Sequence, residues 1–163
     1  SNTPATLTLT GTVYITGDTL IGTTDHSLTL NLNGQTIFVA SDSTHEDDGK
    51  YPLEIGTRCT IEGPGVIIAI GDIYFAPNGD AGGEGAPVFV FSATGTTTIR
   101  PGINIYGAVA GSVAVDIQSG NEPTIIYPEG GFGGYGLNFP GLTEPRLTYS
   151  IASWEVSGLS PGA

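Results

Sequence analysis

Three aspartates that each follow a run of apolar residues are the side chains of this sequence best suited to acid–base chemistry. They are Asp18, Asp72 and Asp116. If the runs are strands stacked side by side, the three carboxylates align on one face, and glycoside hydrolysis requires two carboxyl groups about 5–10 Å apart. Gly-Asp is also an ordinary turn dipeptide, which explains Asp18 and Asp72 without catalysis. We therefore assign no catalytic residue and expect a protein that is not an enzyme.

Nucleophilic catalysis has less support. His26 and His45 are the only histidines in the sequence, and each lies in a polar stretch without a neighbouring serine or cysteine motif. Cys59 is the only cysteine, so no disulfide can form within the chain. It alternates with apolar residues over 53–61, which predicts a small buried hydrophobic side chain and not a nucleophile.

Two acidic stretches offer oxygen ligands of the kind that Ca²⁺ binds. The first spans residues 42–48 and the second residues 78–84. Their oxygen-bearing side chains are Asp42, Glu46, Asp47, Asp48, Asn78, Asp80 and Glu84. Neither stretch has the spacing of a calcium-loop motif, and a solvated acidic loop explains both without a metal. We assign no metal ligand and no cofactor, and calcium stays an open alternative.

The net charge of the chain limits the classes of partner that it can bind. The 163 residues include 16 acidic and 4 basic ones, for a formal net charge of −12. Nucleic acid and anionic membrane surfaces attract Lys and Arg, so both are disfavoured as partners. The four basic residues are also too scattered to clamp an acidic polysaccharide. A hydrophobic content of 39% argues against disorder, and the length suits one domain with one core.

Apolar segments rich in β-branched residues, separated by glycine, predict a succession of strands and almost no helix. The stretch 64–78 is the centre of this series, because residues 66–70 form the longest apolar run and predict a fully buried strand. The predicted strand regions span residues 6–16, 28–40, 52–63, 64–78, 88–102, 103–120, 124–128 and 146–156.

The corners between the strands favour one all-β architecture. Apolar runs end in ITGD at 15–18, AIGD at 69–72 and VAGS at 109–112, whereas Asn33-Gly34 is the only good hairpin signal. We predict a single domain over 1–163, folded as a right-handed parallel β-helix (a β-solenoid), with a β-sandwich as the alternative. Residues 129–145, rich in Gly, Pro and aromatics, are predicted to fold over an end of the core as a capping loop.

The segments GPGVIIAIGDIYFAPN, VFVFSATGTTTIRPGINIYGAVAGSVAVDIQSG and TYSIASWEVS carry a resemblance. Together with TGTVYITGD and LTLNLNGQTIFV, they resemble the C-terminal region of bacterial surface proteins in which a PilX-type, pilin-like N-terminal helix precedes a predicted parallel β-helix. The resemblance covers roughly residues 6–156. It implies an extracellular or cell-surface module, pilus-associated, whose native anchor helix would precede this sequence. It carries over no catalytic residue.

These observations lead to one functional expectation and two alternatives. We expect a non-enzymatic structural or adhesive module of the cell surface or a pilus, whose partners are other pilus or surface proteins, or surface glycans. The first alternative is a carbohydrate-binding or carbohydrate-cleaving β-helix, for which Tyr14, Tyr74 and Tyr106 would supply outward aromatic rings. The second is a subunit of a self-assembling filament, joined through exposed strand edges.

Overall fold

The computed structural model describes residues 4–23, 26–43, 50–121, 123–129, 131 and 133–137. Every helix or strand within these residues is a β-strand, and the strands pair in parallel. The prediction of an all-β chain is confirmed. The parallel pairing does not fit the alternative of a β-sandwich, whose sheets are antiparallel.

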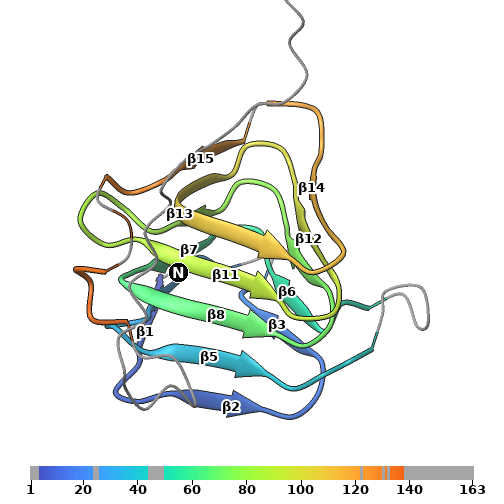
Figure 1. The fold of residues 1–163 in the computed structure, drawn as a ribbon, viewed down its shortest axis with the longest axis horizontal. Helices are drawn as coiled ribbons and strands as arrows, with labels where there is room; N and C mark the ends of the chain where they lie inside the picture. The colour runs from blue at the N-terminus through green and yellow to red at the C-terminus, as the bar shows by residue number, and fades with distance from the viewer. Residues whose placement is uncertain are drawn as a thin grey trace, which may run out of the picture.

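The strands form three faces, which the chain visits in turn (Figure 1); we call each face a sheet, although the first two are joined through β13. The first sheet contains β1 (Ala5–Thr8), β4 (Leu28–Asn31), β7 (Cys59–Glu62), β10 (Asp80–Ala81), the first half of β13 (Asn104–Gly111) and β15 (Thr124–Ile126). The second contains β2 (Val13–Ile15), β5 (Thr36–Val39), β8 (Gly65–Ala69), β11 (Val88–Ser92) and the second half of β13. The third contains β3 (Thr19–Ile21), β6 (Leu53–Ile55), β9 (Ile73–Phe75), β12 (Thr96–Ile99) and β14 (Ala114–Ile117). We call three consecutive strands, one from each sheet, a rung.

Each strand pairs with the equivalent strands of the neighbouring rungs. In the second sheet, for example, Ile67 pairs with Ile37 on one side and with Val90 on the other. The chain length from one rung to the next varies: 31 residues separate Asn31 from Glu62, but only 18 separate Arg100 from Gln118. Register is therefore kept by the strands, and the connections absorb the differences in length.

Most of the predicted strand regions contain two strands with a corner between them. Asn33 and Gly34 both have positive φ, 49° and 77°, and the Gln35 N–H donates to the Leu32 carbonyl at 2.8 Å, as in a tight turn. The flanking strands β4 and β5 belong to different sheets and do not pair with each other. The turn signal was therefore read correctly as a turn, but it makes a corner and not a hairpin.

Inward side chains of the three sheets form one apolar core. It is built from columns of equivalent residues, such as Leu30 with Ile61 in the first sheet and Ile55 with Phe75 in the third. Cys59 is 1% exposed and packs in this core, which confirms its prediction as a buried hydrophobic side chain. In β8, Val66, Ile67 and Ala69 are fully buried, whereas Ile68 points outward and is half-buried, so the run 66–70 is not buried throughout.

The predicted Gly-Asp corners all lie between the second and third sheets. Asp18 directly precedes β3, and Asp72 directly precedes β9, two rungs further along. The opposite corner, from the third sheet back to the first, uses Arg58 and Asn78, whose φ values are 62° and 61°. Asn tolerates this left-handed conformation better than most residues, which gives Asn78 a structural role.

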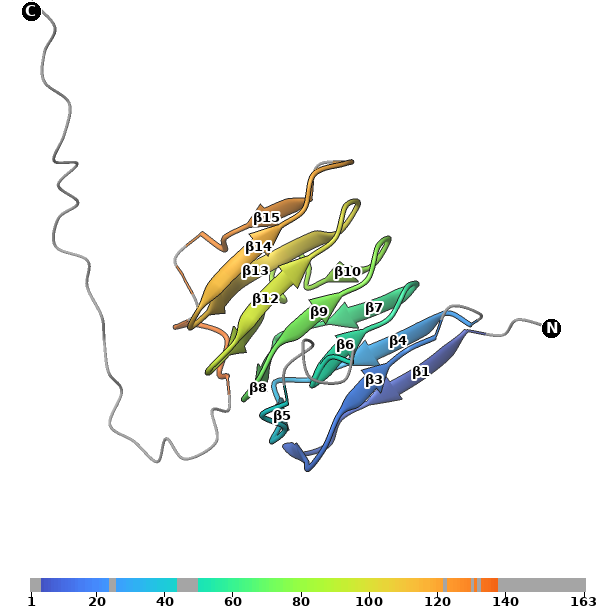
Figure 2. The same cartoon turned by 90° about the vertical axis from the view of Figure 1, so that its right-hand side faces the viewer.

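Only part of the predicted capping loop lies within the described residues. Its portion 133–137 lies beside the second sheet, near β5 and β8, in both views (Figures 1 and 2). The predicted strand 146–156 lies outside the described residues.

Candidate functional site

Two stacked tyrosines on the outer face of the third sheet form the centre of the candidate site. Tyr74 points outward from β9, between Glu54 of β6 and Thr98 of β12 in register. Tyr51 comes from the end of the connection between β5 and β6, immediately before Pro52. Its ring lies on that of Tyr74 with the centroids 4.4 Å apart and an angle of 13° between the ring planes. Such offset stacking adds to the burial of both rings.

Several charged groups act electrostatically on the Tyr51 phenol. Burial raises the pKa of Tyr51, and Tyr74, Asp72 and Glu54 raise it further, whereas Arg100 opposes them. The guanidinium of Arg100 donates through Nη1 to Oε1 of Gln118 on the next rung. An aromatic pair bordered by two carboxylates and a guanidinium can stack on an apolar ring face and hydrogen-bond hydroxyl groups, which is the chemistry of carbohydrate recognition.

Asp18 and Asp72 hold corners of the fold. Oδ1 of Asp18 accepts hydrogen bonds from Ser41 at 2.6 Å and Ser43 at 2.7 Å, and these bonds lower its pKa. Oδ1 of Asp72 accepts the backbone N–H of Thr96 at 2.7 Å. A general acid of a glycosidase needs a raised pKa, so Asp18 does not fit that role.

Asp116, the third aspartate, does not lie at a corner with Asp18 or Asp72. It points outward from β14 and is exposed, and its register partner is Thr98, which in turn pairs with Tyr74. The three aspartates thus share one side of the molecule, but Asp116 lies two rungs beyond Tyr74. Its Oδ2 accepts a hydrogen bond from Gln118 at 3.3 Å.

The side chains considered for calcium form no cluster within the described part of the chain. Asp80 lies in β10 of the first sheet, where its Oδ1 accepts a hydrogen bond from Asn104 at 2.9 Å. Asn78 occupies a left-handed corner, and residues 46–48 lie outside the described residues. Among the residues that the structure describes, no group of three or more His, Cys, Asp or Glu side chains is placed to hold a metal ion.

The remaining sequence candidates do not join the site. His26 is exposed, and its backbone N–H donates to the Thr23 hydroxyl at 3.3 Å, while His45 lies outside the described residues. Burial raises the pKa of Cys59 to about 11, which makes its thiol a poor nucleophile at neutral pH.

The three tyrosines proposed as a sugar-binding platform point from three different sheets. Tyr14 belongs to β2 and stacks on Phe38 of β5, with the ring centroids 5.1 Å apart. Tyr74 belongs to the third sheet, and Tyr106 lies in the first-sheet half of β13, paired with Ile126. Only Tyr74 therefore belongs to the candidate site, and its partner there is Tyr51, which the sequence did not single out.

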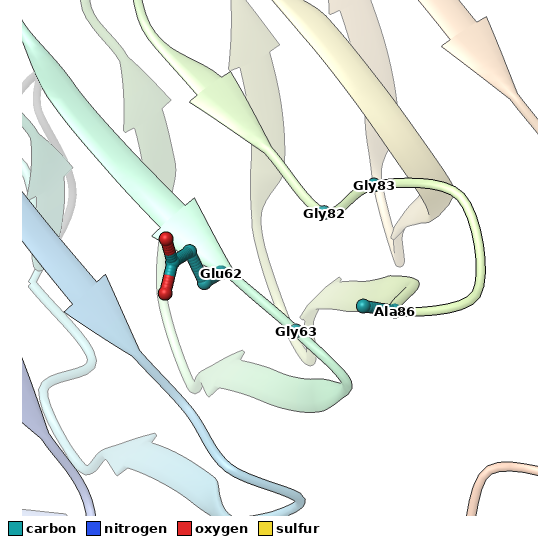
Figure 3. Close-up of a pocket in the computed structure, with 5 residues that line it drawn as sticks. All are labelled: Glu62, Gly63, Gly82, Gly83 and Ala86. Carbon is teal, nitrogen blue, oxygen red and sulfur yellow. The ribbon is translucent and has the colours of Figure 1, made fainter.

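A shallow hollow at the corner of the first and second sheets offers no comparable set of groups. It has a volume of about 260 Å³ and is lined by Glu62, Gly63, Gly82, Gly83 and Ala86. Figure 3 shows that the Glu62 side chain points away from the loop that carries Gly83 and Ala86. Its carboxylate instead accepts a hydrogen bond from Asn31 of the neighbouring strand at 3.1 Å.

Comparison with protein-family models, curated proteins and solved structures finds no match to this chain. Within the described ranges, no helix has the length and apolar character needed to cross a membrane.

Proposed function

We propose that the chain is a non-enzymatic structural and adhesive module, built as a right-handed parallel β-helix and displayed on a cell surface or a pilus. The parallel pairing of equivalent strands from rung to rung supports the β-helix architecture. Its hand is supported by the path in Figure 1, in which the second sheet runs left to right in front, the third sheet follows behind, and the rungs rise from β2 to β15. Parallel crossovers are right-handed in nearly all proteins.

One observation carries the non-enzymatic part of this proposal. Two of the three aspartates that the sequence offered for catalysis hold corners, Asp18 with Ser41 and Ser43, and Asp72 with the Thr96 backbone. The third, Asp116, is exposed on β14, two rungs beyond Tyr74. A catalytic pair would instead present one proton-donating and one nucleophilic or basic oxygen to a bound substrate.

Turnover measurements test this part directly. The full chain is incubated with a panel of neutral and acidic polysaccharides, and released reducing ends or unsaturated products are measured. We expect no turnover above that of a heat-denatured sample. Sustained turnover that is lost in both Asp18→Asn and Asp72→Asn, with both variants still folded, would overturn the proposal.

The placement on a cell surface or pilus rests on the sequence resemblance. It predicts that the full-length protein reaches the outside of the producing cell, where antibodies against the chain label intact cells. Partners would then be pilus or surface proteins, or glycans. Labelling only after the cells are permeabilised would contradict this placement.

The second candidate function is glycan binding through the third sheet, favoured by the Tyr51–Tyr74 pair and the charges around it. A glycan array with and without Ca²⁺ tests it. We expect any specific signal to fall in Tyr51→Ala and Glu54→Gln but to persist in Tyr14→Ala, which removes a ring from the second sheet. A signal that follows Tyr14 instead would reject this face as the binding site.

Self-assembly end to end is a weaker candidate. Leu7 is 54% exposed at one end of the stack and Ile117 is 52% exposed at the other. However, β15 adds a further strand to the first sheet alone, so a second copy stacked on it would face unmatched second and third sheets. Light scattering over a range of concentrations distinguishes a monomer from a growing filament.

A further inference from the structure

The outer face of the second sheet differs in character from the outer faces of the other two sheets. In the first sheet, one outward column is polar throughout: Thr6, Thr29, Thr60, Asp80, Asn104 and Thr124. In the third, the outward column is mixed and mostly polar: Leu20, Glu54, Tyr74, Thr98 and Asp116. In the second, the equivalent column is Tyr14, Phe38, Ile68, Phe91 and Ala110. We call this column the apolar stripe.

Two ring pairs lie on this outer face. Tyr14 and Phe38 stack along the stripe at an angle of 9°, whereas Phe89 lies beside the stripe on β11, with its ring centroid 6.3 Å from that of Phe91 and at 17° to it. Phe38, Ile68 and Phe91 point out of the core, and each is half-buried. An outward column of apolar side chains that its neighbours cover only in part is a candidate interaction surface.

Part of this face is already covered. Thr36 and Val66 are register partners next to the apolar stripe, and both are fully buried, yet Val66 does not belong to the core cluster. Groups outside the core therefore cover them, among which Phe89 is the register partner of Val66 on β11. Residues 133–137 lie on this side of the molecule, beside β5 and β8, in both views (Figures 1 and 2). The last described segment of the chain, 133–137, thus lies on the same side of the molecule as the apolar stripe.

We propose that the apolar stripe is the docking surface for the C-terminal segment of this same chain, residues 138–163. The composition of the segment fits, because it supplies apolar and aromatic side chains with few charges. Its large apolar residues are Phe139, Leu142, Leu147, Tyr149, Ile151, Trp154, Val156 and Leu159. The stripe itself contains no charged residue, and the segment carries only Glu144, Arg146 and Glu155, so contact through its apolar side chains need bury no unpaired charge.

The C-terminal segment is also long enough to reach along the whole stripe, and it starts on the same side of the molecule. Five strands about 4.8 Å apart make the stripe roughly 20 Å long. The residues from 138 to 145 alone span up to about 26 Å when extended, at about 3.3 Å per residue. The predicted strand 146–156 can therefore lie over Phe38, Ile68 and Phe91 without any change in the described part of the fold. A second copy of the chain is the competing occupant, and the experiment below separates the two.

Trp154 is the only tryptophan of the chain, so its fluorescence reports on this segment alone. The full chain is measured as a monomer, verified by light scattering, before and after unfolding in urea. We expect the emission of the folded monomer at clearly shorter wavelength, and its quenching by acrylamide several-fold weaker, than in the unfolded chain. A folded monomer whose Trp154 is quenched as readily as in urea would overturn the proposal, and this measurement needs no variant.

Variants then locate the docking surface. Phe91→Ser and Ile68→Ser should shift the emission toward that of the unfolded chain, with strand content retained by circular dichroism. Thr60→Ser and Thr98→Ser, on the outer faces of the other two sheets, are matched controls and should leave it unchanged. A response to Ile117→Ser at the open end, without a response to Phe91→Ser, would place the segment elsewhere and contradict the proposal. Protection of Trp154 that appears only on dimerisation would assign the stripe to a second copy instead.

Discussion

The Oδ1 atom of Asp72 accepts the backbone N–H of Thr96 at 2.7 Å, and so joins the corner of one rung to the corner of the next. We expect Asp72→Ala to lower the free energy of unfolding by about 1 kcal/mol, because a partly buried N–H loses its carboxylate acceptor. Asp116→Ala is the matched control, since Asp116 is exposed on the same side of the molecule. Urea unfolding of both variants measures the difference, and equal losses would contradict a special role for the corner.

The hydrogen bonds to Asp18 predict a dependence of stability on pH. Ser41 and then Ser43 hold the pKa of Asp18 below its ordinary value of 3.8 in the folded chain. The contribution of Asp18 is therefore fully present above that value and is lost as the pH falls through the lower, folded-state pKa. We expect Asp18→Asn to flatten the acid side of the plot of Tm against pH; an unchanged plot would contradict this role of Ser41 and Ser43. The effect is small because Asp18 is exposed.

The Cys59 thiol should be inert while the chain is folded. Its pKa of about 11 leaves little thiolate at pH 8, and the side chain is only 1% exposed. A disulfide reagent should therefore modify Cys59 only as fast as the protein opens, and immediately in urea. Rapid modification of the folded chain would show that the core at β7 is accessible.

Gly107 should not tolerate a side chain. It lies where β13 passes from the first to the second sheet, with φ at +156°, and a Cβ atom there would meet the Val88 carbonyl oxygen at 1.8 Å. We expect Gly107→Ala to cost more than about 2 kcal/mol, because the clash is with backbone. Gly11→Ala is the control, since nothing lies within 4 Å of its added Cβ. Chemical unfolding that gives similar values for the two variants would contradict the geometry.

Ile99 and Ile117 are register partners in the third sheet with opposite environments. Ile99 is fully buried, whereas Ile117 at the end of the stack is 52% exposed. We expect Ile99→Ala to cost about 2–5 kcal/mol and Ile117→Ala less than about 1 kcal/mol. Equal costs, measured by thermal and urea unfolding, would mean that the end of the stack is covered in solution.

The sequence predicted local structure well, because alternation and glycine corners are local signals. It located most strands, the buried character of Cys59, and the corners at Asp18 and Asp72. It missed β3 (Thr19–Ile21) and β10 (Asp80–Ala81), which are short and polar or flanked by glycine. It also could not distinguish a corner from a hairpin at Asn33-Gly34, because that depends on which strands pair.

The candidate site was harder to predict for the same reason. Tyr51 follows an acidic stretch, and Tyr74 lies 23 positions further along, so only the pairing of β6 with β9 brings their rings together. Tyr14, Tyr74 and Tyr106 look equivalent in the sequence, each within a β-rich segment. Their separation onto three sheets follows from the number of corners between them, and no local feature of the sequence encodes that number.

The long connection between β5 and β6 has a practical consequence. It is the main source of the 31-residue spacing between Asn31 and Glu62, and yet the strands on either side of it keep the same register as strands joined by short corners. The register of each strand is set by its hydrogen bonds to the neighbouring strands and does not depend on the length of this connection. We therefore expect a change in the length of the chain between Ser43 and Lys50 to leave the pairing of β5 with β8 and of β6 with β9 in register.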